Sequence, residues 1–111
     1  MQAQLSKQEA IEEITRRIVA HYHPVRVYLF GSEARGDAGP DSDLDFMVVL
    51  PDDMPESTMR FNDIHRVLAG VSVPKDVIPW RLGDFAIRSA YVPTSLPATV
   101  IREGRLLYDA A

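Results

Sequence analysis

Apolar positions in the first part of the chain follow a helical spacing. Isoleucines recur at intervals of three and four residues, at Ile11, Ile14 and Ile18. This pattern predicts a helix from about Lys7 to Tyr22, ending before Pro24. Ser6 and Glu9 have the spacing of a capping box, in which each side chain accepts the other residue's backbone N–H at a helix start. We therefore expect an amphipathic first helix with one face against the core.

Two runs of β-branched and aromatic residues predict strands. The first is Val25 to Phe30, and the second, Leu44 to Leu50, is almost wholly apolar after Asp45. Continuous apolarity indicates a strand that is covered on both faces. Between the strands, Ser32 to Arg35 is expected to form a short helical turn, and residues 37–41 have the composition of a loop.

The second half of the chain alternates between helical and strand-like segments. Phe61, Ile64 and Leu68 predict a second helix that Gly70 closes, and Val71 to Pro79 predicts a third strand. Three more elements follow: a helix over residues 83–90, a helix from Thr94 or Ser95 to Glu103, and a short strand at Arg105–Tyr108. This order predicts an α/β fold of the α+β kind, with a mixed central sheet flanked by helices.

Composition narrows the class of protein. A chain of 111 residues with 46% hydrophobic and 25% charged residues is expected to form one globular domain over residues 1–111. No apolar run is long enough to span a membrane. The net charge of −4 disfavours broad binding to a nucleic-acid backbone, which relies on clustered positive charge. The lack of cysteine fits a cytoplasmic protein.

The segment from Gly31 to Asp45 carries the chemistry and reads G-S-E-A-R-G-D-A-G-P-D-S-D-L-D. A Gly-Ser turn after a strand offers backbone N–H groups and the hydroxyl of Ser32 to phosphate oxygens. Asp43 and Asp45 alternate along a strand, so they share one face with Cα atoms roughly 6.5 Å apart. Carboxylates in this arrangement suit the divalent cations that accompany phosphates. We therefore predict that this segment handles a nucleotide.

A two-metal site usually needs a third carboxylate, and Asp76 is the best candidate. It is the only acid in the apolar run from Val73 to Ile78, and a neighbouring strand would bring it beside the first two. In this interpretation Asp76 completes the metal site and helps to deprotonate the acceptor hydroxyl. The alternative is a buried acid that pairs with Lys75 or Arg81.

Two other sets of residues have open interpretations. Arg35 could contact phosphates or pair with a loop acid such as Asp37. His21 and His23 have the spacing of a metal pair, although at a helix end they more often cap the helix.

The motif from Gly31 to Asp45, followed by V-x-x-D-V-I around Asp76, resembles that of the polymerase-β-like nucleotidyltransferase superfamily. The short length, the A-R-G in the loop and the closing I-R-E-G-R-L-L-Y resemble the minimal nucleotidyltransferase (MNT) branch over most of Leu5 to Tyr108. The resemblance implies that Gly31 and Ser32 bind the triphosphate of ATP. It also implies that Asp43, Asp45 and Asp76 bind two Mg²⁺ ions.

Members of that branch are antitoxins encoded beside a HEPN-type ribonuclease toxin. The resemblance implies transfer of AMP from ATP to a tyrosine of that toxin, which neutralises it. One alternative is transfer to a small molecule such as an aminoglycoside. Another is a binding module that blocks the toxin by contact, without catalysis.

Overall fold

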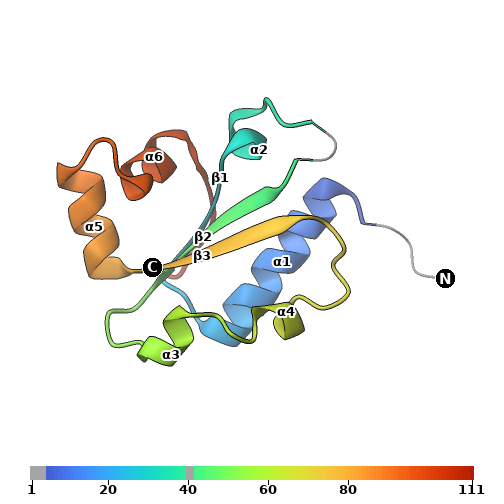
Figure 1. Cartoon of the computed structure of the whole chain (residues 1–111), viewed down its shortest axis with the longest axis horizontal. Helices are drawn as coiled ribbons and strands as arrows, with labels where there is room; N and C mark the ends of the chain where they lie inside the picture. Colours follow the sequence, from blue (N-terminus) through green and yellow to red (C-terminus); the bar gives the residue numbers. More distant parts are fainter. Residues whose placement is uncertain (1–4, 40–41) are drawn as a thin grey trace.

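A mixed sheet forms the centre of the molecule (Figure 1). The computed structural model describes residues 5–39 and 42–111. The strands are β1 (Arg26–Phe30), β2 (Leu44–Leu50), β3 (Lys75–Arg81) and β4 (Arg105–Asp109), in the order β3-β2-β1-β4. β1 is antiparallel to both β2 and β4, whereas β2 and β3 are parallel. The predicted fold class, a mixed sheet flanked by helices, is confirmed.

The first helix, α1 (Lys7–Tyr22), has the predicted bounds and the predicted cap. The Ser6 hydroxyl accepts a hydrogen bond from the Glu9 N–H at 3.1 Å, and the Glu9 carboxylate accepts one from the Ser6 N–H at 3.0 Å. The inward face is buried at Ala10, Ile11, Ile14, Ile18 and Tyr22. Helix α1 therefore begins at a well-defined point and is held along its length by the core.

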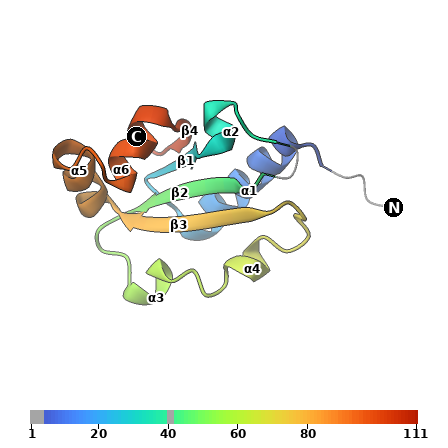
Figure 2. The same cartoon turned by 45° about the horizontal axis from the view of Figure 1, so that its top comes forward.

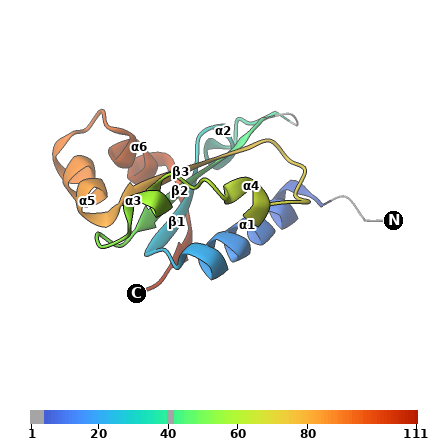
Figure 3. The ribbon, with the colours of Figure 1, turned by 60° about the horizontal axis from the view of Figure 1, so that its bottom comes forward.

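The two faces of β2 pack against different helices, as the alternation of side chains along a strand requires. Leu44, Phe46, Val48 and Leu50 belong to the core cluster that includes the buried side of α1. Met47 and Val49 point the other way and pack with residues of α5 (Leu82–Tyr91) and α6 (Leu96–Glu103). Figure 2 shows α5 and α6 on one side of the sheet, and Figure 3 shows α1 and α4 (Ile64–Val67) together on the other. The central strand is covered on both faces, as predicted.

The second helix was predicted wrongly as one continuous element. The structure has two single turns, α3 (Glu56–Met59) and α4, and between them Phe61 adopts a left-handed φ of +47°. The ring of Phe61 packs against that of Tyr22, with centroids 4.4 Å apart, and the Tyr22 hydroxyl donates to Asp63. These contacts with α1 hold the segment in a shape that its local apolar spacing does not predict.

The third strand starts later than predicted, at Lys75 instead of Val71. Val71 is buried in the core cluster instead, and pairing with β2 begins where the Leu44 N–H donates to the Pro74 carbonyl at 2.9 Å. Pro79 lies within β3 because β3 is an edge strand, where a missing N–H is tolerated. The short turn α2 (Ser32–Arg35) and the C-terminal elements fall within one or two residues of their predicted bounds.

The loop predicted over residues 37–41 is described up to Gly39; Pro40 and Asp41 lie outside the described residues. The Ser42 hydroxyl accepts from the Gly39 N–H at 2.9 Å, and the Ser42 N–H donates back to the Gly39 carbonyl at 3.2 Å. Of the helices in the described part of the chain, none combines the length and apolarity that a membrane crossing needs.

Candidate functional site

A turn at Gly31 follows β1 directly and lies against Asp45. Phe30 pairs with Asp45 across the antiparallel β1–β2 ladder, so the next residue passes close to that carboxylate. Gly31 has a φ of +79°, and a Cβ at this position would lie well inside van der Waals contact with Asp45 Oδ2. Glycine is therefore required here twice, for the backbone conformation and for the space.

The sheet register brings Asp45 and Asp76 side by side. The two residues are paired in the parallel ladder of β2 and β3. Asp43 lies two residues before Asp45 and is exposed, Asp45 is half-buried, and Asp76 is exposed. The exposure of Asp76 disagrees with the alternative interpretation of a buried acid, because β3 is an edge strand and not a covered one.

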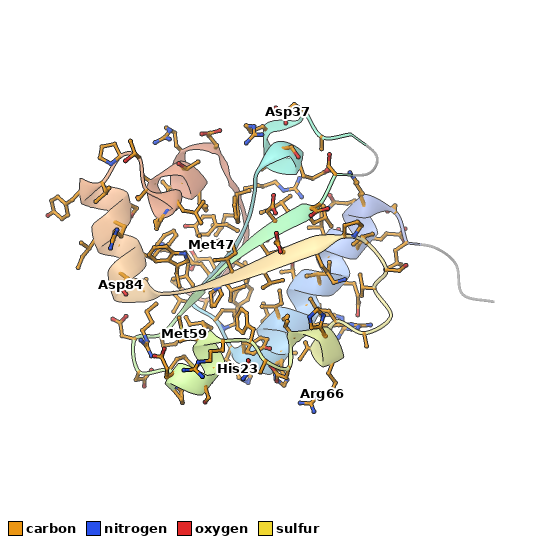
Figure 4. The ribbon with its side chains drawn as sticks, in the orientation of Figure 1. His23, Asp37, Met47, Met59, Arg66 and Asp84 are labelled. Atoms are coloured by element: carbon orange, nitrogen blue, oxygen red, sulfur yellow. The ribbon has the colours of Figure 1, made fainter. Side chains whose placement is uncertain are left out.

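The carboxylates share a sheet face with the α5–α6 hairpin. Alternation along β2 places Asp45 on the same face as Met47 and Val49, which α5 and α6 cover. Figure 4 shows Met47 between the sheet and these helices. One end of this face is therefore packed against helices. At the other end, Asp45 is half-buried and Asp76 is exposed to solvent.

The charges around Asp45 interact with one another. Partial burial raises the pKa of Asp45, and the negative charges of Asp76 and then Asp43 raise it further, while Arg35 acts in the opposite direction. Like charges held near one another disfavour ionisation, whereas a cation favours it. A cation bound near Asp45 would therefore stabilise the ionised carboxylates.

The donor set suits a hard divalent cation, because carboxylate oxygens are the ligands that Mg²⁺ takes in proteins. Gly31 leaves room beside Asp45 Oδ2 that a side chain would fill. As the side chains stand, no group of three or more His, Asp or Glu residues within residues 5–39 and 42–111 converges closely enough to hold a metal ion. The arrangement is a set of carboxylates on one face, each with rotatable side-chain bonds, and not a closed cage.

The alternative partners of Asp76 are engaged elsewhere. The Lys75 ammonium donates to the carbonyls of Val71 and Val73 at 2.7 and 3.1 Å. The Arg81 guanidinium donates to the Met54 carbonyl at 3.0 Å and to Glu56 at 3.3 Å. In the described part of the chain, neither cation forms an ion pair with Asp76. The structure therefore does not support the interpretation of Asp76 as an acid paired with Lys75 or Arg81.

Arg35 forms the predicted pair with a loop acid. Its Nε atom donates to Asp37 Oδ2 at 3.3 Å, and both side chains are largely exposed. Asp37 lies at the outer end of α2, away from the sheet (Figure 4). Contact between Arg35 and phosphates stays a prediction, which its influence on Asp45 makes geometrically reasonable.

The two histidines do not form a metal pair. His21 Nε2 lies 2.6 Å from Asp63 Oδ2, and His23 caps the C-terminus of α1 with a left-handed φ of +50°. Their structural interpretation as helix-end residues therefore holds.

Sequence reasoning missed a contact between α1 and the Gly31–Asp45 segment. The Lys7 ammonium donates to Glu33 Oε2 at 3.1 Å and to the Gly39 carbonyl at 2.8 Å. These residues are far apart in the sequence, and the helix cap at Ser6 indicates only that Lys7 begins a helix. No local pattern could have predicted the contact.

Solved structures with the same fold are 18–22% identical to this chain. A toxin–antitoxin with AMP-PNP has a TM-score of 0.58 at 21% identity, covering 88% of this chain and 73% of its own. A proposed nucleotidyltransferase from Sulfolobus solfataricus has a TM-score of 0.60 at 22% identity, covering 91% and 78%. A mutant of the toxin–antitoxin MntA-HpeT has a TM-score of 0.55 at 18% identity, covering 95% and 74%. At these identities the likeness establishes the fold alone.

None of the curated proteins matches this chain. The nucleotidyltransferase domain family matches residues 9–96, a span that runs from α1 through the Gly31 turn, both aspartate-bearing strands and α5 to the start of α6. With the fold, the match and the glycine turn beside the paired aspartates in agreement, this chain belongs to the nucleotidyltransferase domain family.

Proposed function

We propose that this protein is a cytoplasmic antitoxin that transfers AMP from ATP to a tyrosine hydroxyl of a HEPN-type ribonuclease toxin and thereby neutralises it. The whole chain would act as one minimal transferase domain, with Mg²⁺ as the required ion. The proposal rests on family membership, on the aspartate face beside Gly31, and on the resemblance of the motif to minimal nucleotidyltransferases.

The observation that carries the chemistry is the position of Gly31 against Asp45, with Asp76 on the adjacent strand. A phosphate at the glycine turn would lie next to Asp45, whose partner on the adjacent strand is Asp76. A binding module without catalysis would not require carboxylates beside a phosphate site. Clustered acids destabilise the fold when no cation is bound, which favours a catalytic role.

In the proposed mechanism, Gly31 and Ser32 hold the triphosphate, and Arg35 adds positive charge. Asp43, Asp45 and Asp76 would hold two Mg²⁺ ions, which when bound neutralise the charge of the phosphates. The tyrosine oxygen forms a bond to the α-phosphorus of ATP. The bond from that phosphorus to the oxygen bridging to the β-phosphate breaks, and pyrophosphate leaves with the electron pair. The carboxylate of Asp76 is the group we assign to take the phenolic proton.

The toxin as acceptor is supported by what the structural neighbours are. Two of them are toxin–antitoxin complexes, one of them with AMP-PNP, an analogue of ATP. A partner that supplies its own tyrosine needs no acceptor pocket in the transferase itself.

The test is incubation of the protein with the toxin encoded beside it, Mg²⁺ and ATP labelled in the α-phosphate. We expect the label on a toxin tyrosine, located by mass spectrometry, with loss of ribonuclease activity. An Asp43→Ala/Asp45→Ala variant should lose at least about a hundredfold in rate, because it removes metal ligands. An Asp53→Ala/Asp84→Ala variant carries the same change in charge at exposed positions and should label normally; Asp84 lies at the start of α5, next to the end of β2 opposite to Asp45 and away from α2 (Figure 4).

Two results would contradict the proposal. If the Asp43→Ala/Asp45→Ala variant neutralises the toxin in a stoichiometric complex, then contact without catalysis is sufficient. If the wild-type protein labels aminoglycosides or similar hydroxyl compounds and leaves the toxin unlabelled, then the acceptor is a small molecule.

A further inference from the structure

The hydrogen bonds of the described residues between the Gly31 turn and β2 are mostly internal, although Ala34 packs against the core. Asp37 N–H donates to the Ser32 carbonyl, Arg35 pairs with Asp37, and Gly39 and Ser42 bond to each other. These bonds fold the segment locally but do not fix it relative to the rest of the protein. Its position must therefore be set by contacts from other elements.

Lys7 supplies a hydrogen-bonded contact from another element, helix α1. Among the described residues, it is the only one outside residues 31–43 whose side chain hydrogen-bonds into that segment. Its ammonium bonds the carboxylate of Glu33 and the carbonyl of Gly39 at the same time. The side chains of Lys7 and Glu33 are 29% and 22% exposed, so the ion pair is shielded from solvent more than a surface pair is. One charge thus joins α2 to the loop that leads to Asp43.

The other end of this link is rigid. Lys7 is the first residue of α1, where the reciprocal bonds of Ser6 and Glu9 close the helix end. Ala10, Ile11 and Ile14 are then buried in the core one turn further on. Because α1 cannot shift without disturbing the core, the backbone of Lys7 is held in place. Its ammonium can therefore anchor the segment through the bonds to Glu33 and Gly39.

We propose that Lys7 is a positioning residue for nucleotidyl transfer, which holds Ser32 and Asp43 in place around Asp45, whose own position beside Gly31 is set by the β1–β2 ladder. Glu33 follows Ser32 directly, and Gly39 lies on the path to Asp43, so the two bonds of Lys7 hold both sides of the site. The role of Lys7 in transfer rests on the proposed function; its role as a link does not. Misplacement of reacting groups by about 1 Å can lower rates by about a hundredfold.

The experiment compares Lys7→Met with Lys7→Arg, Glu33→Ala and Arg16→Met. Arg16→Met is the matched control, because it removes one positive charge from the same helix at a position whose side chain, within residues 5–39 and 42–111, pairs only with Glu13. Hydrogen exchange of the amides of residues 36–39 measures the link in the protein alone. Transfer kinetics and calorimetric binding of Mg²⁺ with AMP-PNP measure its effect on the site, and thermal unfolding checks that each variant is folded.

We expect Lys7→Met to speed exchange at residues 36–39 by about tenfold and to lower kcat/KM by about tenfold. Lys7→Arg, which keeps the charge and donors, should stay within about twofold of wild type. Glu33→Ala should change in the same direction as Lys7→Met, and the double variant should be no worse than Lys7→Met alone.

Unchanged exchange in a folded Lys7→Met protein would overturn the link. Tighter binding of AMP-PNP by Glu33→Ala would also overturn the proposal, since it would show that freeing Lys7 lets it bind phosphate directly. If the wild-type protein transfers AMP to no acceptor, the proposed function fails, while the exchange rates still decide whether Lys7 holds the segment.

Discussion

Gly31 is the position in the candidate site at which an added methyl group would be most disruptive. Its φ of +79° disfavours any L side chain, and a Cβ would collide with Asp45 Oδ2. Gly36 also has a positive φ, of +82°, but its ψ of 11° is left-handed helical, whereas the ψ of −156° at Gly31 lies in a region open almost to glycine alone. A Cβ at Gly36 would meet nothing within 4 Å. Gly31 therefore combines severe backbone strain with crowding beside the carboxylate, and Gly36 has the milder strain alone.

We predict that Gly36→Ala loses about 1–2 kcal/mol of unfolding free energy from its left-handed backbone. Gly31→Ala should lose more, and its kcat/KM should fall at least about tenfold, because Asp45 must move. Gly36→Ala should keep most of its activity. Urea unfolding and transfer kinetics check both variants, and equal activities would show that the space beside Asp45 is not needed.

The residues of the site differ in how well the sequence predicts them. Gly31 and the Asp43–Asp45 pair stand out because their spacing follows directly from a strand, a turn and a second strand. Asp76 is suggested by its isolation in an apolar run, but its exposure depends on β3 lying at the sheet edge, which no local pattern reveals. The role of Lys7 cannot be predicted from the sequence, because its partners, Glu33 and Gly39, are far away along the chain and meet it only in the folded protein.

Between elements, the carboxylate of Asp63 is one of the groups that link α1 to α4. Asp63 accepts a hydrogen bond from the Tyr22 hydroxyl and interacts with His21, both at the end of α1. The Tyr22 hydroxyl, with His21 in a lesser role, lowers the pKa of Asp63 from its ordinary value of 3.8. The folded protein therefore prefers the ionised carboxylate more strongly than the unfolded chain does.

This preference gives a pH-dependent contribution to stability. It is fully present above pH 3.8, and it is lost as the pH falls through the lowered pKa of the folded state, because the unfolded chain then binds more protons. We predict that Asp63→Asn loses about 1 kcal/mol at pH 7, a value reduced by the exposure of the side chain. The loss should disappear at acidic pH in urea titrations, whereas Asp53→Asn should show no such trend. A loss of equal size at every pH would assign the effect to packing and not to charge.

Elements are predictable from the sequence where their own residues decide their shape. The bounds of α1 and β2 agree with prediction because a capping box and an uninterrupted apolar run act locally. The segment around Phe61 was predicted as one helix, since its apolar spacing is helical. Packing of Phe61 against Tyr22 overrides that local preference, and no pattern within the segment reports a ring on another helix.

In the whole molecule, the candidate site joins three separate parts of the chain: the turn after β1, the start of β2 and the start of β3. A ligand bound there would bind the folded chain and not the unfolded one. Mass action then raises the unfolding free energy, by about 2.7 kcal/mol when the free ligand exceeds its Kd a hundredfold.

We therefore predict that Mg²⁺ with AMP-PNP raises the thermal unfolding midpoint of the wild-type protein. The Asp43→Ala/Asp45→Ala variant should show no rise, and the Asp53→Ala/Asp84→Ala variant should behave as wild type. Differential scanning calorimetry with and without EDTA measures the effect. A rise of equal size in the Asp43→Ala/Asp45→Ala variant would place nucleotide binding elsewhere on the molecule.

The parallel pairing of β2 with β3 also bears on synthesis of the protein. A parallel pair needs a long connection, so Asp45 and Asp76 meet only after the chain between them has been made and folded across the sheet. A growing chain that has left the ribosome as far as Leu50 carries the glycine turn and two carboxylates without the third. Domains made at about 5–20 residues per second need several more seconds to supply it. Any partner that meets the nascent chain in that interval meets a candidate site without its third carboxylate.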